Sequence, residues 1–337
     1  MNKLLLASLA LVLGLAGCAG PANPGPPTQT TAADRHAQLA AVMPMPDPSQ
    51  YQEVYLGWQD PSRGREVPAK LYLPVQASTP VPLVVFSHGI GGSREGYSYL
   101  GKHWAAQGYA SLHLQHVGSD RGLWLGNPLG LVNRLQTAAR EEEAMDRARD
   151  VQFALDQVLA GEWAPRVDAL RIVAAGHSYG ANTVLLLAGA QVQRGGQPVV
   201  LRDPRIRAAV LLSAPPFYGE SDVSRILGGI RIPTLHITAE ADDIRIPGYL
   251  SGLKDREQVF AATGSAQKAL AVFKDGSHSI FTDRLGTGGL ALNPQVKVAT
   301  RDLTLAFWQS VLTGQTQALQ TWPARHAAIV SRFDPRW

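Results

Sequence analysis

A serine between two glycines, at residues 176–180, is the stretch of this sequence with the clearest potential for chemistry. The five residues read Gly-His-Ser-Tyr-Gly, with Ser178 at the centre. The apolar run Leu170 to Ala175 precedes them, and a helical pattern opens at Ala181. A sharp turn from strand to helix exposes a serine hydroxyl, and the N-terminus of the helix directs backbone N–H groups at a developing anion. The pattern therefore predicts that Ser178 is a nucleophile.

A serine nucleophile needs a general base, and chain order restricts the choice among the nine histidines. In the α/β-hydrolase layout the partners follow the serine in the order Asp or Glu, then His. Only His278 and His326 lie far enough beyond Ser178. Of these two, only His278 lies in a loop directly after a predicted strand, Ala269 to Phe273. The spacing therefore predicts His278 as the base.

A serine and a histidine that act together need an acidic residue as the third member of a triad. The candidates for this acid lie in one loop. Predicted strand Thr234 to Thr238 is followed by a loop that contains Glu240, Asp242 and Asp243. One of these carboxylates has to orient His278 and stabilise its imidazolium. The residues alone leave open which of the three it is.

A glycine-rich loop upstream could bind the oxyanion. The apolar run Val81 to Phe86 predicts a buried parallel strand, and Ser-His-Gly-Ile-Gly-Gly follows it at residues 87–92. Backbone N–H groups in such a loop can approach a substrate oxygen closely. Taken alone, the loop could be an ordinary turn, but Ser178 downstream favours a catalytic role.

The elements that would position these residues alternate between strands and helices. Alternation of this kind predicts an α/β fold, with a mostly parallel central sheet and helices on both faces. Further strands are expected at Tyr51 to Trp58, Val67 to Leu73, Ala110 to Leu114 and Ala208 to Leu212, with helices at Leu100 to Gln107 and Glu141 to Leu159. The strand Ala269 to Phe273 is expected to be the last. The acidic run that opens the second helix, Glu141 to Glu143, is interpreted as a solvated helix start.

An apolar insertion lies between a predicted strand and a predicted helix. Residues 121–137 are expected to be irregular, and residues 118–140 are either a cap over the substrate or a packed connection. His177 in the serine turn, Trp124 in the insertion and Phe217 in a later loop are the candidates for the substrate pocket.

Composition excludes several classes of partner. Hydrophobic residues make up 45% and charged residues 17% of the chain, and the net charge of +4 comes from dispersed arginines. No interleaving of basic and aromatic residues marks a nucleic-acid surface, so no nucleic-acid partner is expected.

His113 and His116 lack a cluster of further ligands and are expected to pack at the edge of the sheet, so neither metal nor cofactor is predicted. The sequence indicates no oligomeric state.

The N-terminus has the layout of an exported protein. Residues 1–17 combine Lys3, the apolar run Leu4 to Leu15 and two small residues before Cys18, which resembles a bacterial lipobox. We therefore expect a lipoprotein signal peptide at 1–17, a Pro-rich tether at 18–50 and a catalytic domain at 51–337, with the lipid anchor in the bacterial cell envelope. Ala19 favours the outer over the inner membrane by the bacterial sorting pattern. The alternative is an ordinary signal peptide with a chance cysteine.

These motifs together resemble the α/β-hydrolase group that includes dienelactone-hydrolase-like proteins and platelet-activating factor acetylhydrolases. The segments that carry the resemblance are residues 60–65, 87–92, 149–151, 176–180 and 276–278. The resemblance implies Ser178 as nucleophile, His278 as base, Asp242 as acid, and the backbone N–H groups of Ile90 and Tyr179 as oxyanion donors.

Two departures from that group bear on the reaction. True dienelactone hydrolases use a cysteine nucleophile, which is absent here, and a chain with a single cysteine cannot form the internal disulfide usual in secreted cutinases. Both favour a plain serine esterase that acts on a small-molecule or lipid ester. The insertion is apolar and lacks an Arg or Lys cluster that could bind a phosphate, so neutral esters with short to medium acyl chains are expected. An amidase or peptidase with the same triad, and a non-catalytic binding module, are the alternatives.

Overall fold

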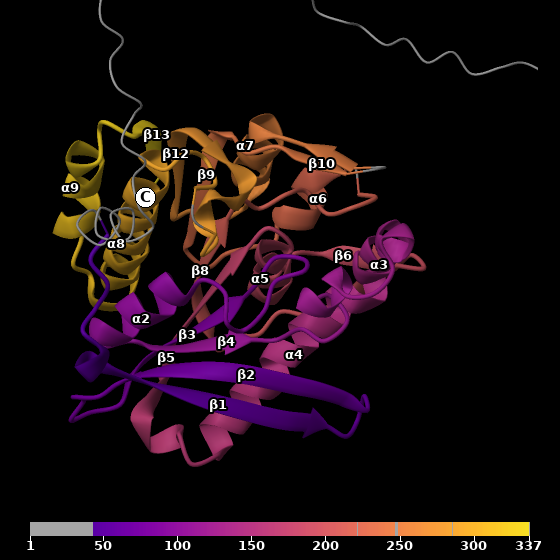
Figure 1. The fold of residues 1–337 in the computed structure, drawn as a ribbon, viewed down its shortest axis with the longest axis horizontal. Coiled ribbons are helices and arrows are strands. Elements are labelled where there is room, and N and C mark those ends of the chain that lie inside the picture. Colours follow the sequence, from indigo (N-terminus) through magenta and orange to yellow (C-terminus); the bar gives the residue numbers. More distant parts are fainter. Residues whose placement is uncertain (1–42, 221, 247–248, 285, 337) are drawn as a thin grey trace, which may run out of the picture. The chain divides into compact units, whose positions relative to one another are not determined.

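A nine-stranded sheet forms the centre of the computed structural model, which describes residues 43–220, 222–246, 249–284 and 286–336 (Figure 1). The predicted signal peptide, Cys18 and the tether as far as residue 42 lie outside the described residues. None of the helices in the described ranges combines the length and the apolar character needed to cross a bilayer.

The sheet is mostly parallel, as the sequence predicts. Its strands are β1 (Tyr51–Asp60), β2 (Arg65–Pro74), β3 (Val81–Ser87), β4 (Ala110–Leu114), β5 (Val167–His177), β8 (Ile206–Leu212), β9 (Thr234–Ala241), β12 (Lys268–Ser277) and β13 (Val330–Arg336). Their spatial order is β1-β2-β4-β3-β5-β8-β9-β12-β13. Neighbours from β4 to β12 run parallel, whereas β1, β2 and β13 pair antiparallel with their neighbours. Two separate antiparallel ribbons join β6 (Val192–Arg194) to β7 (Gln197–Val199) and β10 (Ile244–Ile246) to β11 (Tyr249–Ser251).

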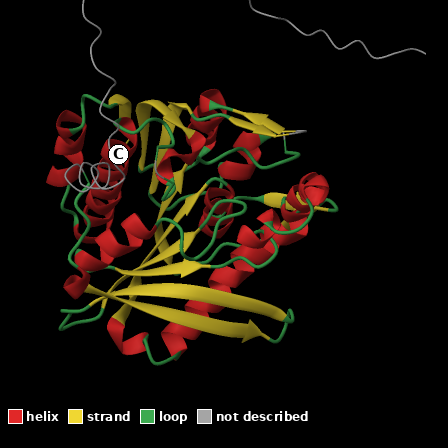
Figure 2. Cartoon of the chain, in the orientation of Figure 1, coloured by secondary structure: helices red, strands yellow, loops and turns green. Residues whose placement is uncertain are grey.

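Helices cover both faces of this sheet (Figure 2). They are α2 (Ser98–Ala106), α3 (Leu131–Ala138), α4 (Glu141–Ala160), α5 (Tyr179–Ala188), α6 (Val223–Leu227), α7 (Leu253–Ala262), α8 (Leu292–Thr313) and α9 (Gln317–Arg325). Short 3-10 helices are η1 (Pro48–Gln50), η2 (Arg121–Trp124), η3 (Pro128–Gly130), η4 (Ala164–Arg166) and η5 (His278–Phe281). Side chains of α4, α5 and α6 share one apolar core with the sheet, and those of α2, α8 and α9 share the other.

The continuous apolar runs of the central strands follow from burial on both faces. Along β3, Leu83 and Val85 belong to the core under α4 and α5, while Val84 and Phe86 belong to the core under α2 and α8. Successive side chains of a strand point to opposite faces, so a strand covered on both sides has to be apolar at every position. The predicted hairpin of β1 and β2 is also present, and its turn includes Gly64 at a φ of 60°.

Three expectations about individual elements are wrong. The last strand is β13 and not the strand Ala269 to Phe273, which forms part of β12. The β13 sequence Val-Ser-Arg-Phe-Asp-Pro-Arg carries charges and a proline, which is a composition that only an edge strand tolerates and that hides the strand from a search for apolar runs.

The second error concerns the insertion, which is not irregular throughout. Residues Leu131–Ala138 form helix α3, and η2 and η3 precede it. Asp120 and Asn127 cap the two 3-10 helices by accepting hydrogen bonds from Gly122 and Leu129. The glycines of the insertion precede α3, so they do not interrupt it.

The third error concerns His113 and His116, which do not lie at the edge of the sheet. β4 runs between β2 and β3 and is the third strand of the sheet, counted from the edge strand β1. His113 is on this strand and His116 follows it, and both side chains are fully buried. Burial disfavours the charged imidazolium and lowers the pKa of His113 to about 3. Both histidines therefore belong to the interior.

Candidate active site

Ser178 occupies the turn between β5 and α5 with a backbone conformation that L-residues rarely adopt, φ 55° and ψ −121°. The flanking glycines are required by close backbone approaches. A Cβ at Gly176 would collide with the carbonyl oxygen of Gly180, and a Cβ at Gly180 would collide with the carbonyl oxygen of Ser87 on β3. The predicted turn is therefore present, and it presents the Ser178 hydroxyl beyond the end of β5.

Three side chains from far apart in the sequence meet at this turn. The Ser178 Oγ lies 2.8 Å from Nε2 of His278, and Nδ1 of His278 lies 2.6 Å from Oδ1 of Asp242. Because a carboxylate can only accept, Nδ1 carries the proton and Nε2 is left to accept the serine O–H. Parallel strands end at the same edge of the sheet, which is why the loops after β5, β9 and β12 converge here.

Only one of the three carboxylates in the loop after β9 reaches His278. Asp242 is fully buried and also accepts a hydrogen bond from Thr238 Oγ1 at 2.6 Å. Asp243 is exposed and pairs with Arg245 at 2.7 Å, and Glu240 accepts a hydrogen bond from the Asp275 N–H. The structure thus brings Asp242 into the hydrogen-bonded chain and leaves the other two outside it.

The environment of Asp242 keeps it ionised. Burial opposes ionisation, but the hydrogen bond and charge of His278 together with the charge of Arg256 outweigh it, and the pKa of Asp242 falls well below its usual value. A permanently charged carboxylate can stabilise an imidazolium that forms on the other side of the hydrogen bond.

His177 lies behind the base and not in an open pocket. Its ring is almost completely buried. Nδ1 accepts from the hydroxyl of Tyr97 at 2.7 Å, and Nε2–H donates to the backbone carbonyl of His278 at 2.9 Å. Burial is the main cause that lowers the pKa of His177 to about 3, so the ring stays neutral. Its contacts hold the loop of His278 in place.

The glycine-rich loop after β3 passes close to Ser178. A Cβ at Gly89 would lie 3.3 Å from the Ser178 Cβ. The Gly89 carbonyl accepts hydrogen bonds from His88 Nδ1 at 2.7 Å and from the Gly92 N–H at 3.0 Å, and these bonds fix the peptide that carries the Ile90 N–H. Within the described ranges, neither the Ile90 N–H nor the Tyr179 N–H donates to a protein acceptor. Both expected oxyanion donors are therefore free to bind a ligand oxygen.

A buried guanidinium forms hydrogen bonds with the start of the glycine-rich loop. Arg147 of α4 is fully buried and donates to Ser119 Oγ at 2.7 Å, Thr183 Oγ1 at 3.0 Å and Ser87 Oγ at 3.1 Å. It also donates to the backbone carbonyl of His88. Burial lowers the pKa of Arg147 to about 10, which still leaves it charged at neutral pH. Arg147 thereby ties the end of β3 to helix α5.

The sequence interpretation missed Arg147, although the pattern contained a signal for it. The residue comes three positions after Ala144 and four before Val151, which places it on the apolar face of its helix. An arginine within an otherwise apolar stripe is expected to be buried and paired.

Further charges surround Arg147. Glu141 and Glu142 are exposed, as expected for a solvated helix start, but Glu143 is not. The Glu143 side chain is largely buried and accepts from Arg65 at 3.1 Å. Asp150 is fully buried and lies 2.9 Å from both Arg63 and Arg65, and 3.0 Å from His116 Nδ1. Arg63 in the turn before β2 and Arg65 at the start of β2 therefore pair with carboxylates on the first half of α4.

Trp124 contacts the glycine-rich loop from above. Its indole Nε1–H donates to the Gly91 carbonyl at 2.7 Å, and its ring occupies the space that a Cβ at Gly91 would need. Leu125 and Leu129, which follow it, are 72% and 91% exposed. The insertion thus touches the candidate site at its first turn and presents apolar side chains to solvent beyond it.

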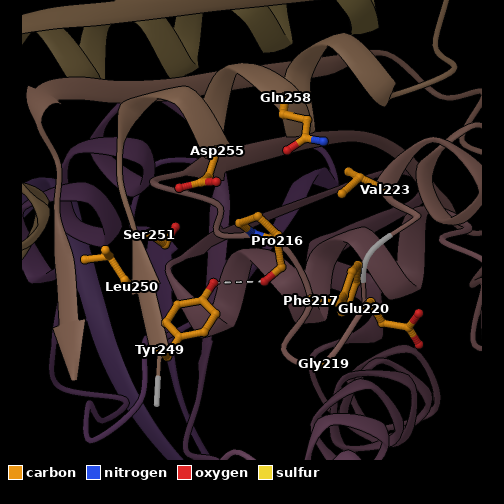
Figure 3. A pocket seen from close by; sticks show the side chains of 10 residues that line it. All are labelled: Pro216, Phe217, Gly219, Glu220, Val223, Tyr249, Leu250, Ser251, Asp255 and Gln258. Carbon is orange, nitrogen blue, oxygen red and sulfur yellow. Dashed lines mark hydrogen bonds between the residues drawn. The ribbon is translucent and has the colours of Figure 1, made fainter. Parts of the chain in front are cut away.

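Phe217 is half-buried at a separate cavity of about 380 Å³, shown in Figure 3. The loop after β8, the strand β11 and helix α7 form its walls. Tyr249 donates a hydrogen bond from its hydroxyl to the Pro216 carbonyl at 3.1 Å across one side of it. None of Ser178, Asp242 and His278 lines this cavity. Among the described residues, no group of three or more His, Cys, Asp or Glu side chains is placed to hold a metal ion.

The mostly parallel sheet, the helices on both its faces and the strand-to-helix serine turn are those of the α/β-hydrolase fold. Residues 64–121 match the family of platelet-activating factor acetylhydrolase, isoform II. The platelet-activating factor acetylhydrolase of Cavia porcellus is 23% identical in an alignment 282 residues long, which covers 73% of this chain. The match spans only 61% of the length of that relative.

Solved structures share the fold. A ferulic acid esterase from Streptomyces cinnamoneus superposes with a TM-score of 0.59 at 23% identity, covering 84% of this chain and 96% of that one. A cold-adapted esterase from an Arctic intertidal metagenomic library gives a TM-score of 0.51 at 20% identity, covering 70% and 89% of the two chains. At these identities the likeness establishes the fold of the chain.

Proposed function

We propose that this protein is a carboxylic ester hydrolase in which Ser178, His278 and Asp242 act as a catalytic triad. The proposal rests on the unbroken hydrogen-bonded chain from the Ser178 hydroxyl through the His278 ring to the buried Asp242, with heavy-atom distances of 2.8 and 2.6 Å. Similarity to an acetylhydrolase and to esterases agrees with this chemistry.

The reaction proceeds through an acyl-enzyme. As the Ser178 Oγ attacks the ester carbonyl, its proton passes to Nε2 of His278, and Asp242 stabilises the resulting imidazolium. The carbonyl oxygen becomes an oxyanion in front of the N–H groups of Ile90 and Tyr179. Collapse of this intermediate expels the alkoxide, which takes the proton from His278. A water molecule, deprotonated by His278, then attacks the acyl group and releases the acid with Ser178 restored.

The substrate we propose is a neutral ester with a short to medium acyl chain. Trp124 of the insertion contacts the glycine-rich loop, and the apolar side chains of Leu125 and Leu129 beyond it are exposed. An apolar wall ranks acyl chains gradually, because each methylene changes the binding free energy by only about 1 to 3 kcal/mol.

A fluorophosphonate probe with a panel of p-nitrophenyl esters and matching anilides tests this function. The full chain should be labelled at Ser178 and should cleave the esters. Faster turnover of the anilides would instead identify an amidase on the same triad. A folded protein that is neither labelled nor active would be a non-catalytic binding module.

Trp124→Ala should raise KM for a hexanoate ester by about tenfold and for an acetate ester by less than about threefold. The reason is that the indole ring offers apolar contact only to a chain long enough to reach it. Initial rates over a series of acyl chain lengths measure this. Trp124→Phe, which keeps a ring but loses the hydrogen bond to Gly91, and Leu129→Ala on the exposed part of the insertion are the matched controls. Equal effects on all chain lengths would assign Trp124 to packing alone.

The N-terminal segment supports a second part of the proposal, that Cys18 carries lipid and anchors the protein to the cell envelope, with the outer membrane favoured. Cys18→Ala should therefore move the protein from the membrane fraction to a soluble or unprocessed form, because the short apolar segment before it ends in Leu-Ala-Gly. Fractionation with detection of the protein on blots measures this. Ala19→Asp is the control, since it keeps the cysteine and should stay membrane-bound. Wild-type protein found wholly in the soluble fraction would refute the anchor.

A further inference from the structure

Besides the His278 ring, a guanidinium approaches the candidate acid. Arg256 of α7 places Nη2 at 3.4 Å from Oδ1 of Asp242, the same oxygen that lies 2.6 Å from His278 Nδ1. The arginine side chain is 2% exposed and that of Asp242 is fully buried. The guanidinium and His278 therefore share one oxygen of the carboxylate. The reaction outlined above does not require the guanidinium, so its position there has another cause.

The position of Arg256 is held from its other side. Its Nη1 donates to the Ser251 hydroxyl on β11, while its Nε has no hydrogen-bond partner among the described residues. Other titratable groups surround the pair. His236 lines the same small cavity as Arg256 and is neutral, because burial lowers its pKa to about 3. His177 packs against the His278 ring with centroids 4.8 Å apart and is neutral, since burial lowers its pKa. Tyr249 is also neutral because burial raises its pKa. Asp255, the neighbour of Arg256, accepts a hydrogen bond from the Gly252 N–H at the start of α7.

We propose that Arg256 is a positioning residue for the triad, which fixes the orientation and the charge of Asp242 and thereby sets the lowest pH at which His278 works as a base. The proposal rests on the function proposed above. The Arg256 charge draws on the same carboxylate oxygen and repels a second positive charge on the imidazole. It therefore opposes protonation of His278 in the free enzyme and extends the active range of the enzyme toward acid.

The sign of the effect follows from this competition. The acidic limb of kcat/KM against pH reports protonation of the base in the free enzyme. If the positive charge of Arg256 is removed, the Asp242 carboxylate interacts with the imidazolium alone, and the repulsion between the guanidinium and the imidazolium disappears. The base then becomes protonated at higher pH. Arg256→Met and Arg256→Gln should accordingly move the midpoint of the acidic limb upward by about one pH unit.

The experiment is a pH profile of kcat/KM for the full chain with a neutral p-nitrophenyl ester. Arg256→Lys keeps the charge and should keep the limb within about 0.3 pH unit of the wild type. Arg332→Met is the matched control. Arg332 lies on β13 and forms a surface ion pair at 2.6 Å with Glu257, which is the neighbour of Arg256 on α7. Its replacement changes the net charge of the protein by the same amount. It should leave the limb in place. If Arg256→Met does not fold, Arg256→Gln against Arg256→Lys decides the question.

The possible outcomes separate this inference from the function on which it rests. An upward shift confined to the Met and Gln variants supports the role of Arg256. A uniform loss of activity at every pH, without displacement of the limb, overturns it and leaves a purely structural arginine. Absence of ester hydrolysis and of fluorophosphonate labelling in the wild type would refute the proposed function itself.

Discussion

Ser178→Ala and His278→Ala should each lower kcat by at least about a thousandfold, and the double variant should lose little more. Each change removes one end of the 2.8 Å hydrogen bond through which the proton moves. Without the serine there is no acyl-enzyme, and without the histidine the serine stays protonated and weakly nucleophilic. Because the two side chains perform one step together, the second substitution lowers kcat little further once the first has abolished that step. Steady-state kinetics on an activated ester measure the three variants, and active-site titration gives the active fraction of the wild type.

Control variants decide whether the loss is chemical or structural. His326→Ala removes the other histidine that lies far beyond Ser178 in the chain, at the end of α9, and should keep kcat within about twofold of the wild type. Far-UV circular dichroism and thermal unfolding should be unchanged in the triad variants. Losses that multiply in the double variant would show that Ser178 and His278 do not act as one unit.

The fold could be predicted from the sequence wherever one local pattern of residues determines the structure. The central strands were predictable because burial on both faces requires apolar residues throughout, as in β3. The turn at Ser178 was predictable because Gly176 and Gly180 face backbone atoms that leave no room for a side chain. The order of the triad along the chain then pointed to His278. For the strands and the turn, the physical constraint acts on neighbouring residues.

Other features depend on contacts between distant segments, and these the sequence could not supply. Glu143 looks like a solvated helix start, yet Arg65, 78 positions earlier, buries it. Arg147 and His177 support the two loops of the site through hydrogen bonds that only the folded chain creates. Arg256 lies 14 positions beyond Asp242, and nothing local reveals that the two side chains meet. Pairs of this kind are determined by the packing of helices on the sheet.

Asp242→Asn should lower kcat/KM by about a thousandfold or more, whereas Asp243→Asn should stay within about twofold of the wild type. An asparagine fills the same space but provides no negative charge for the imidazolium, and its amide can hold the ring in the wrong tautomer. The change has a second cost, because it leaves the buried Arg256 guanidinium without its carboxylate. Loss of one partner of a buried pair lowers the free energy of unfolding by about 3 kcal/mol or more. Among the described residues Asp243 forms an ion pair with exposed Arg245 alone, so its replacement touches neither effect.

Kinetics and urea unfolding on the two variants test both parts of this prediction. The neighbouring positions make a matched pair, since both changes remove one charge from the same loop, but only Asp242 is buried and bonded to His278. Adding Arg256→Met to Asp242→Asn should recover most of the lost stability, because an apolar side chain replaces the unpaired charge, but it should recover none of the activity. Full activity of Asp242→Asn together with a crippled Asp243→Asn would reverse the assignment. It would also require the loop after β9 to turn its other carboxylate toward His278.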